Sequence, residues 1–173
     1  MAGSPTISSL FAQRIVVGVA EFAVANQPLM TISTYALGSC VGLVAYDAVT
    51  KTGGLLHLML PDSALSATKA AAQPAMFADT GIPVLFNGIT GMKAQLGRCK
   101  LFMAGGASVL SGPDSFKIGE RNIVAVRRML GLYGCRLVGE EVGGTVNRTM
   151  HLDLGTGQLT LKMPDRTFTV SLG

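Results

Sequence analysis

Residues 30–60 read MTISTYALGSCVGLVAYDAVTKTGGLLHLML, and this stretch indicates the fold more clearly than any other part of the chain. It contains three apolar runs that have the composition of buried strands, at 30–35, 41–46 and 54–60. Gly38-Ser39 and the 47–54 segment separate these runs with residues that favour turns. Together with a similar run at 15–20, these runs are expected to form a meander of four strands.

Further strands are expected on both sides of this stretch, at 15–20, 100–103 and 137–142. Near the C-terminus, apolar side chains alternate with polar ones on either side of Gly155-Thr156-Gly157. Such alternation is typical of strands with one buried face, so this region is expected to form a hairpin. The alternating residues are Met150, Leu152, Leu154, Leu159, Leu161 and Met163.

Two helices are expected between these strands. Apolar residues recur at helical spacing after Asp79, with Pro83 in the first turn, and this pattern predicts a first helix that ends near Gly97. A second apolar stripe follows Asn122, which is expected to cap that helix, and Gly134 is expected to end it.

Strands outnumber helices in this interpretation, which predicts an α+β fold. The expected architecture is a layered sandwich of mainly antiparallel sheet with two principal helices in a single domain. Residues 1–14 are rich in Ser and small side chains and are expected to form a loose extension, so that residues 15–173 make up the domain. A chain of 173 residues is long enough to bury a large core.

Composition and charge exclude some classes of protein. Hydrophobic residues make up 49% and charged residues 14% of the chain, which excludes a disordered protein. The net charge of +4 arises from scattered Lys and Arg, so nucleic acid is a poor candidate for a partner, whereas an acidic protein surface fits.

The sequence also favours a cytoplasmic protein without membrane insertion. Residues 1–12 lack the basic and apolar segments of a secretory signal, and the uncharged run 22–46 is too polar to span a bilayer. The three cysteines cannot all pair within one chain, and their spacing matches no zinc motif. Free thiols are expected, and no metal or cofactor is predicted.

Cys40 and His57 are the candidates for chemistry. Cys40 follows Gly38-Ser39 at a turn between two apolar runs, where backbone amides can face a cleft. A nucleophilic cysteine attacks as a thiolate and needs a base and oxyanion donors, so the Cys40 thiol is expected to have a low pKa. If the runs 41–46 and 54–60 pair as antiparallel strands, the side chains of Cys40 and His57 can meet near one end of the pair.

These residues also have structural interpretations. A lone Cys in an apolar run is usually inert core, and a His between two Leu residues is usually a buried histidine with its hydrogen bonds satisfied. Cys99, Cys135 and His151 are expected to be structural. Gly105-Gly106 fits a phosphate loop only weakly, because no Walker lysine follows it, and close backbone packing explains it better.

Several segments, in this order and spacing, resemble the CheD family, the chemoreceptor glutamine deamidases of chemotaxis. The resemblance covers nearly the whole chain beyond residue 15. Its strongest parts are Leu37-Gly38-Ser39-Cys40-Val41 and the seven residues from His57 to Ser63. The other matching segments are 17–24, 78–79, 104–107, 118–122, 143–144, Arg148 and 156–157.

The resemblance implies a catalytic set of Cys40, His57 and Thr34, with Gly38 and Ser39 near the oxyanion. It implies deamidation of glutamine to glutamate on the cytoplasmic helices of methyl-accepting chemotaxis proteins, through a cysteine thioester and without a cofactor. In enzymatic terms, this is a protein-glutamine glutaminase. Hydrolysis of glutamyl methyl esters and binding to a CheC-type phosphatase are also implied.

Two other functions stay open at this point. The chain could chiefly bind and stimulate a CheC-type phosphatase, with hydrolysis secondary, or it could be a thiol deamidase that acts on another protein. The chain departs from the family pattern at Met76-Phe77, in the long 63–74 loop, and at Thr145 and Asn147. These departures bear on docking, because none of them falls on the predicted catalytic residues.

Overall fold

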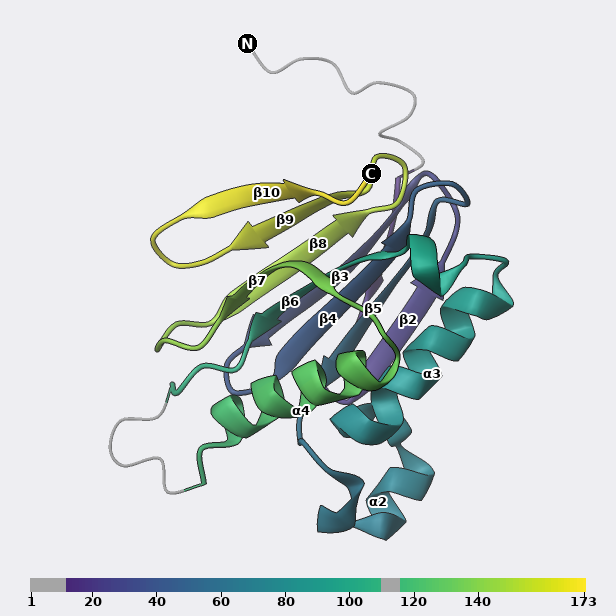
Figure 1. Cartoon of the computed structure of the whole chain (residues 1–173). Coiled ribbons are helices and arrows are strands. Elements are labelled where there is room, and N and C mark those ends of the chain that lie inside the picture. The colour runs from purple at the N-terminus through teal and green to yellow at the C-terminus, as the bar shows by residue number, and fades with distance from the viewer. Residues whose placement is uncertain (1–11, 110–115) are drawn as a thin grey trace.

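In the computed structural model, the described residues, 12–109 and 116–173, form two five-stranded sheets that pack face to face (Figure 1). The first sheet has the strand order β1-β3-β8-β9-β10, and the second has the order β2-β5-β4-β6-β7. Among these described strands, β1 with β3 and β6 with β7 pair in parallel, and all other neighbours are antiparallel. This arrangement confirms the predicted α+β fold with mainly antiparallel sheet. The predicted meander is wrong, because β4 pairs with β5 whereas β3 lies in the other sheet, between β1 and β8.

The bounds of the elements are as follows. The strands are β1 Gln13–Val16, β2 Glu21–Ala25, β3 Met30–Leu37, β4 Val41–Asp47, β5 Thr52–Leu58, β6 Lys100–Gly105, β7 Leu137–Val142, β8 Arg148–Asp153, β9 Gln158–Lys162 and β10 Thr167–Ser171. The α-helices are α2 Ala67–Ala72, α3 Ala78–Gly91 and α4 Ile118–Leu132. Short 3₁₀ turns are η1 Ser63–Leu65, η2 Pro74–Met76 and η3 Leu96–Arg98.

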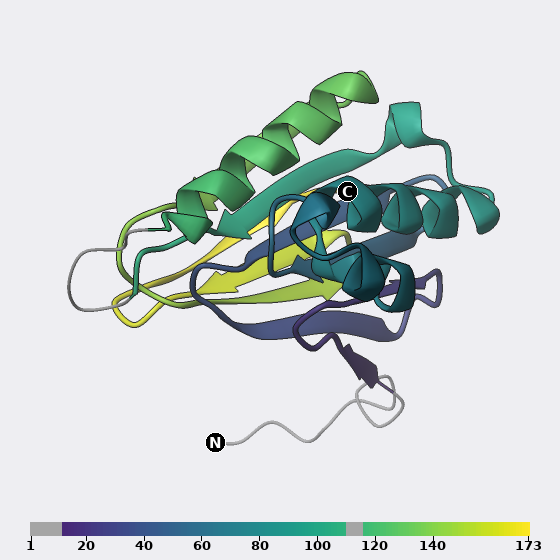
Figure 2. The ribbon, with the colours of Figure 1, turned by 90° about the horizontal axis from the view of Figure 1, so that it is seen from below.

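Two apolar layers hold the fold together. One lies between the sheets and includes Leu37, Leu55 and Met150. The other lies between the second sheet and the helices α3 and α4, which cover its outer face (Figures 1 and 2). Every residue of β4 and β5 is buried, because both faces of these central strands are covered. This double burial explains why the 41–46 and 54–60 runs are continuously apolar instead of alternating.

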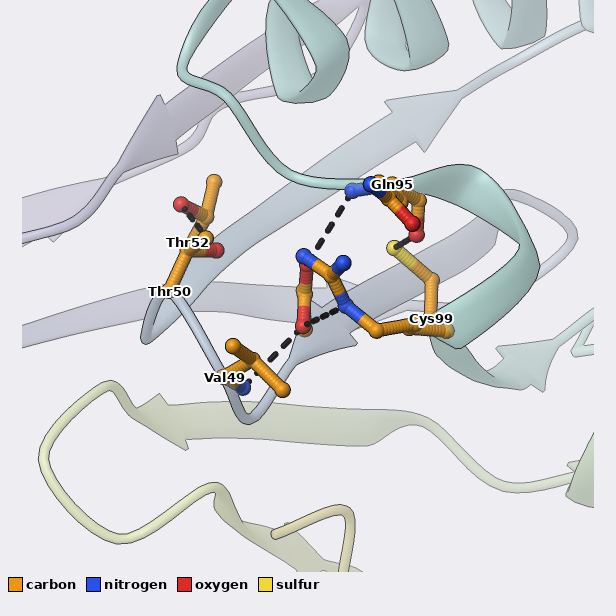
Figure 3. Close-up of polar contacts among 7 residues, drawn as sticks. Val49, Thr50, Thr52, Gln95 and Cys99 are labelled. Carbon is orange, nitrogen blue, oxygen red and sulfur yellow. Dashed lines mark hydrogen bonds and ion pairs between the residues drawn. The ribbon is translucent and has the colours of Figure 1, made fainter.

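Asp47, at the end of β4, anchors this strand to the turn before β6. Its carboxylate accepts two hydrogen bonds from Arg98, at 3.2 and 2.6 Å. It also accepts one each from the backbone amides of Val49 and Gln95, which are labelled in Figure 3. The hydrogen bonds from Arg98 lower the pKa of Asp47 to about 2 and outweigh burial, which acts to raise it. The sequence interpretation did not foresee this cluster.

Several predicted boundaries are wrong. The run 15–20 is not one strand, because β1 ends at Val16 and β2 begins at Glu21, with Ala20 between them in a left-handed conformation at φ 63°. The first helix begins at Ala78, so Pro83 lies in its second turn and not its first, and it ends at Gly91 and not near Gly97, where a 3₁₀ turn follows instead. The second helix begins at Ile118, so Asn122 is not its cap but a buried residue of its second turn.

Other elements were missed or fall at the edge of what is described. The helix α2 lies in the long 63–74 loop, and β10 is an edge strand whose sequence Thr-Phe-Thr-Val-Ser alternates polar and apolar residues, a signal that the sequence interpretation overlooked. The predicted boundary at residue 14 falls inside β1, and residues 1–11 of the predicted extension lie outside the described residues. None of the helices described is both long and apolar enough to cross a membrane.

Candidate active site

The predicted residues Cys40 and His57 lie on the same face of the second sheet. Gly42 of β4 pairs with His57 of β5, and Cys40 is two residues before Gly42. Cys40 directly precedes β4 and packs against the apolar layer between the sheets, so its side chain lies on the same face as that of His57, which contacts Thr34 of the other sheet. A Cβ at Gly42 would touch Leu37 and Met150 of the first sheet, which identifies this face as the one between the sheets.

Thr34 of β3 reaches His57 from the opposite sheet. Its hydroxyl oxygen lies 2.7 Å from Nδ1 of His57 and 2.7 Å from the carbonyl oxygen of Val17. Because the hydroxyl has a single proton and donates it to Val17, it must accept a hydrogen bond from His57. The neutral imidazole is therefore protonated on Nδ1, and its Nε2 carries the lone pair.

The Nε2 atom of His57 has no hydrogen-bond partner among residues 12–109 and 116–173, although the side chain is buried. A buried nitrogen without a partner is uncommon in a folded protein and calls for an explanation. A base that is ready to take a proton from a neighbouring group provides one.

Burial decides the charge of both groups. It lowers the pKa of His57 to about 4, although the nearby carboxylate of Glu21 acts in the opposite direction. Burial also raises the pKa of the Cys40 thiol, an effect that the backbone amide of Cys40 itself partly offsets. The low pKa predicted for the Cys40 thiol is therefore wrong, and thiol and imidazole are both neutral near pH 7.

The turn that carries Cys40 is held by its carbonyl groups. The carbonyl oxygens of Gly38 and Cys40 accept hydrogen bonds from the amides of Ala107 and Gly106, each at 2.8 Å, and the side chain of Asn122 donates to Ser39 O at 2.9 Å. Within the described chain the Ser39 amide has no acceptor, and the Cys40 amide faces its own sulfur. These two amides are thus available to a developing oxyanion.

Gly105-Gly106 lies against this turn. Gly105 has φ +111°, and a Cβ there would come within 2.2 Å of the carbonyl oxygen of Cys40. A Cβ at Gly106 would strike Ile123 of α4 at 2.5 Å. The pair therefore allows close backbone packing between the Cys40 turn and α4, which is the interpretation that the sequence favoured over a phosphate loop.

The remaining Cys and His residues lie away from this site. Cys99 and Cys135 pack against the layer between the second sheet and the helices, and burial raises the pKa of both thiols, that of Cys99 to about 11. His151 shares a 2.7 Å hydrogen bond with Ser33 and contacts the ring of Tyr35. Nowhere in the described chain do three His, Cys, Asp or Glu side chains gather as a metal site requires.

Sequence reasoning missed two residues near the site. Glu21 of β2 pairs directly with His57 in the sheet register, a relation between distant residues that no local pattern reveals. Asn122 binds the Cys40 turn from α4. Its sequence signal was an Asn at the helical spacing of the buried residues Ile123 and Val126, and the cap interpretation concealed it.

Comparisons with known proteins give a consistent family. The sequence model of the CheD family, described as CheD chemotactic sensory transduction, matches residues 59–163. This match begins beyond Thr34, Cys40 and His57, so it does not include the predicted catalytic residues.

Curated relatives cover most of the chain. A protein of Solibacter usitatus named "Probable chemoreceptor glutamine deamidase CheD" is 45% identical over 150 residues, which are 87% of this chain and 89% of the relative. A similarly named protein of Syntrophus aciditrophicus is 43% identical over 86% of this chain and 92% of its own length. One from Pyrococcus abyssi is 41% identical, with 87% and 91% covered. The chain therefore belongs to the CheD family.

Proposed function

We propose that this chain hydrolyses the side-chain amide of glutamine residues in chemoreceptors, with Cys40 as nucleophile, His57 as base and Thr34 as the residue that positions His57. The observation that carries the proposal is the Thr34–His57 hydrogen bond, which occupies Nδ1 of His57. The buried Nε2 atom then has no hydrogen-bond partner in the described chain, and it lies on the sheet face that also carries Cys40. The names of the relatives, chemoreceptor glutamine deamidases, support the choice of substrate.

The first half of the cycle forms a thioester. Nε2 of His57 takes the proton of the Cys40 thiol as the sulfur attacks the Cδ carbon of glutamine. The amides of Ser39 and Cys40 stabilise the negative oxygen of the tetrahedral intermediate. His57 then returns the proton to the departing nitrogen, ammonia leaves, and the acyl group stays on Cys40.

The second half releases the product. Neutral His57 takes a proton from water, the resulting hydroxide attacks the thioester carbon, and the Cys40 sulfur leaves with the proton that His57 returns. The product is glutamate. With a glutamyl methyl ester, the same steps release methanol, so esterase activity is part of the proposal.

Proton transfer accompanies the attack in this mechanism. A stored thiolate–imidazolium pair would need a raised His57 pKa and a lowered Cys40 pKa, and burial shifts both values in the opposite direction. His57 therefore acts as a general base during the reaction. Because the imidazole of His57 is a weak base, its protonated form is a strong acid and readily returns the proton to the leaving nitrogen.

The product changes the receptor's charge. Each conversion adds one carboxylate to a receptor helix and thereby changes the repulsion between neighbouring helices. The family resemblance also implies a CheC-type phosphatase as a second partner. If this chain chiefly binds and stimulates such a phosphatase, receptor glutamines will remain unchanged while the phosphatase binds tightly.

The decisive experiment incubates the protein with cytoplasmic fragments of chemoreceptors and maps glutamine-to-glutamate changes by peptide mass spectrometry. Native protein is expected to convert specific glutamines, and Cys40→Ala is expected to convert none while keeping its fold. Cys135→Ala is the matched control and should retain activity, because its thiol packs against the other apolar layer. Conversion by Cys40→Ala at the native rate would exclude the mechanism.

A further inference from the structure

Asn122 is a fully buried polar residue on α4, and it bridges the two segments that carry the nucleophile and the base. Its Nδ2 atom donates one hydrogen bond to the carbonyl oxygen of Ser39, at 2.9 Å, and a second to that of Met59, at 3.0 Å. Ser39 directly precedes Cys40, and Met59 is two residues beyond His57. One side-chain nitrogen thus uses both of its protons to join these segments.

The bond to Ser39 also determines where an amide proton points. The carbonyl of Ser39 and the N–H of Cys40 belong to one peptide unit, and in a trans peptide these groups point in opposite directions. No cis peptide bond occurs in the described chain. Because Asn122 holds the carbonyl of Ser39 toward α4, the amide of Cys40 must point away from α4.

The neighbouring peptide unit is held in the same way by the backbone. The amide of Ala107 binds the carbonyl of Gly38, and this fixes the direction of the Ser39 amide. The two candidate oxyanion donors are thus oriented by two different groups. The Ser39 amide is oriented by the main-chain amide of Ala107, which only a substitution to proline would remove. The Cys40 amide is oriented by the side chain of Asn122.

We propose that Asn122 is a positioning residue that tethers the Cys40 turn to α4 and thereby aligns the Cys40 amide as an oxyanion donor. This inference rests on the proposed function, since the oxyanion arises in glutamine hydrolysis. An amide side chain suits the role because it offers two protons on one nitrogen, whereas an Asp carboxylate would repel both carbonyl oxygens.

The test compares Asn122→Ala and Asn122→Leu with Val126→Ala. Val126 lies one turn further along the same buried face of α4 and has no polar role, so its truncation reproduces the loss of packing alone. The Leu variant fills the space of Asn122 without a donor, which provides a second folded protein if the Ala variant is unstable.

Two rates on Cys40 separate the roles. Deamidation passes through an oxyanion, whereas alkylation by iodoacetamide does not. In both Asn122 variants, kcat for deamidation is expected to fall about tenfold or more with little change in KM, while alkylation of Cys40 stays within about threefold of native. Val126→Ala should leave both rates near native. Unchanged kcat, or an equal loss of both rates, would overturn the inference.

A measurement without substrate tests the inference separately from the proposed function. The amides of Gly106 and Ala107 donate to the Cys40 turn, and their hydrogen exchange can be followed by NMR. Both should exchange about tenfold faster in Asn122→Ala than in Val126→Ala, because the turn has lost a tether. Equal exchange would contradict the role of Asn122. A native protein that deamidates no receptor would contradict the proposed function alone.

Discussion

Thr34, His57 and Glu21 show how individual contacts set the protonation of the proposed base. The hydroxyl of Thr34 fixes the imidazole tautomer, burial between the sheets makes the ring neutral, and Glu21 on the neighbouring strand limits that effect. The Thr hydroxyl brings no charge, unlike the carboxylate of many triads, so it orients the imidazole without stabilising an imidazolium.

Substitution of Thr34 tests this orienting role. Thr34→Val removes the acceptor for the Nδ1 proton of His57 and the donor to Val17, so kcat is expected to fall about tenfold or more, which corresponds to about 1.4 kcal/mol in the barrier. Thr34→Ser keeps the hydroxyl and should retain much of the activity. Steady-state kinetics on receptor fragments measure both. If Thr34→Val has almost no effect on kcat and Thr34→Ser lowers it more, the side chain of Thr34 contributes only packing.

The pH dependence of turnover tests the charge of His57. The base must be neutral, so kcat/KM should stay level at neutral pH and fall as the pH drops through about 4, well below the ordinary value of 6.5. Glu21→Gln removes the group that raises the pKa of His57, so the acid limb should move to lower pH. An acid limb near 6.5 in the native enzyme would contradict a buried neutral imidazole.

At the scale of elements, the site depends on how closely three backbone segments approach one another. The Cys40 turn, the 105–107 segment at the end of β6 and the first turns of α4 are in contact, and the glycines lie where a side chain would separate them. The strands supply the functional side chains, while the loops and α4 set the direction of the peptide groups around Cys40.

Gly105→Ala should disrupt this contact. Its Cβ would overlap the carbonyl oxygen of Cys40 and would occupy a backbone conformation at φ +111° that L residues rarely adopt. We expect a loss of stability of about 1–3 kcal/mol and a large loss of deamidation. Gly131→Ala on α4 is the control: nothing lies within 4 Å of its Cβ, and it should stabilise the helix by about 0.5–1 kcal/mol. Thermal melts and activity assays that rank the two variants in the reverse order would contradict this account.

At the scale of the whole molecule, two buried titratable groups make the stability depend on pH. The pKa of His57 is about 4 in the folded protein and 6.5 ordinarily, so the unfolded chain binds more protons between these values. Stability is therefore full above pH 6.5 and declines as the pH falls toward 4. Asp47 has an ordinary pKa of 3.8 and a pKa of about 2 in the folded protein, so the unfolded chain again binds more protons between these values. Stability therefore declines a second time as the pH falls from 3.8 toward 2.

Urea unfolding at a series of pH values measures the free energy of unfolding across both pH ranges. Asp47→Asn should lower the free energy of unfolding by about 1–3 kcal/mol at pH 7, because it weakens the bonds to Arg98, and should remove the decline below pH 3.8. His57→Gln should remove the decline between 6.5 and 4 and leave the lower one. Stability that rises as the pH falls from 6.5 to 4 would contradict the His57 assignment, and stability that stays level as the pH falls from 3.8 to 2 would contradict the Asp47 assignment.

Much of this protein was determined by local sequence. The continuous apolar runs predicted β4 and β5, the alternation around 155–157 predicted the β8–β9 hairpin, and Gly134 marked the end of α4. Composition and periodicity suffice for such elements because each residue's neighbours along the chain decide them. The resemblance to the CheD family added Thr34 to Cys40 and His57, which local pattern alone could not have done.

Only the tertiary structure decided the protonation of His57 and the contacts of Asn122. The tautomer and low pKa of His57 require Thr34, which is 23 residues away, and the opposite sheet, which removes water from the ring. Asn122 meets Ser39 across 83 residues of chain, and that contact turned a predicted helix cap into a buried tether. Hydrogen-bond direction and desolvation depend on which distant surfaces meet, and that information exists only once both sheets and α4 have packed together.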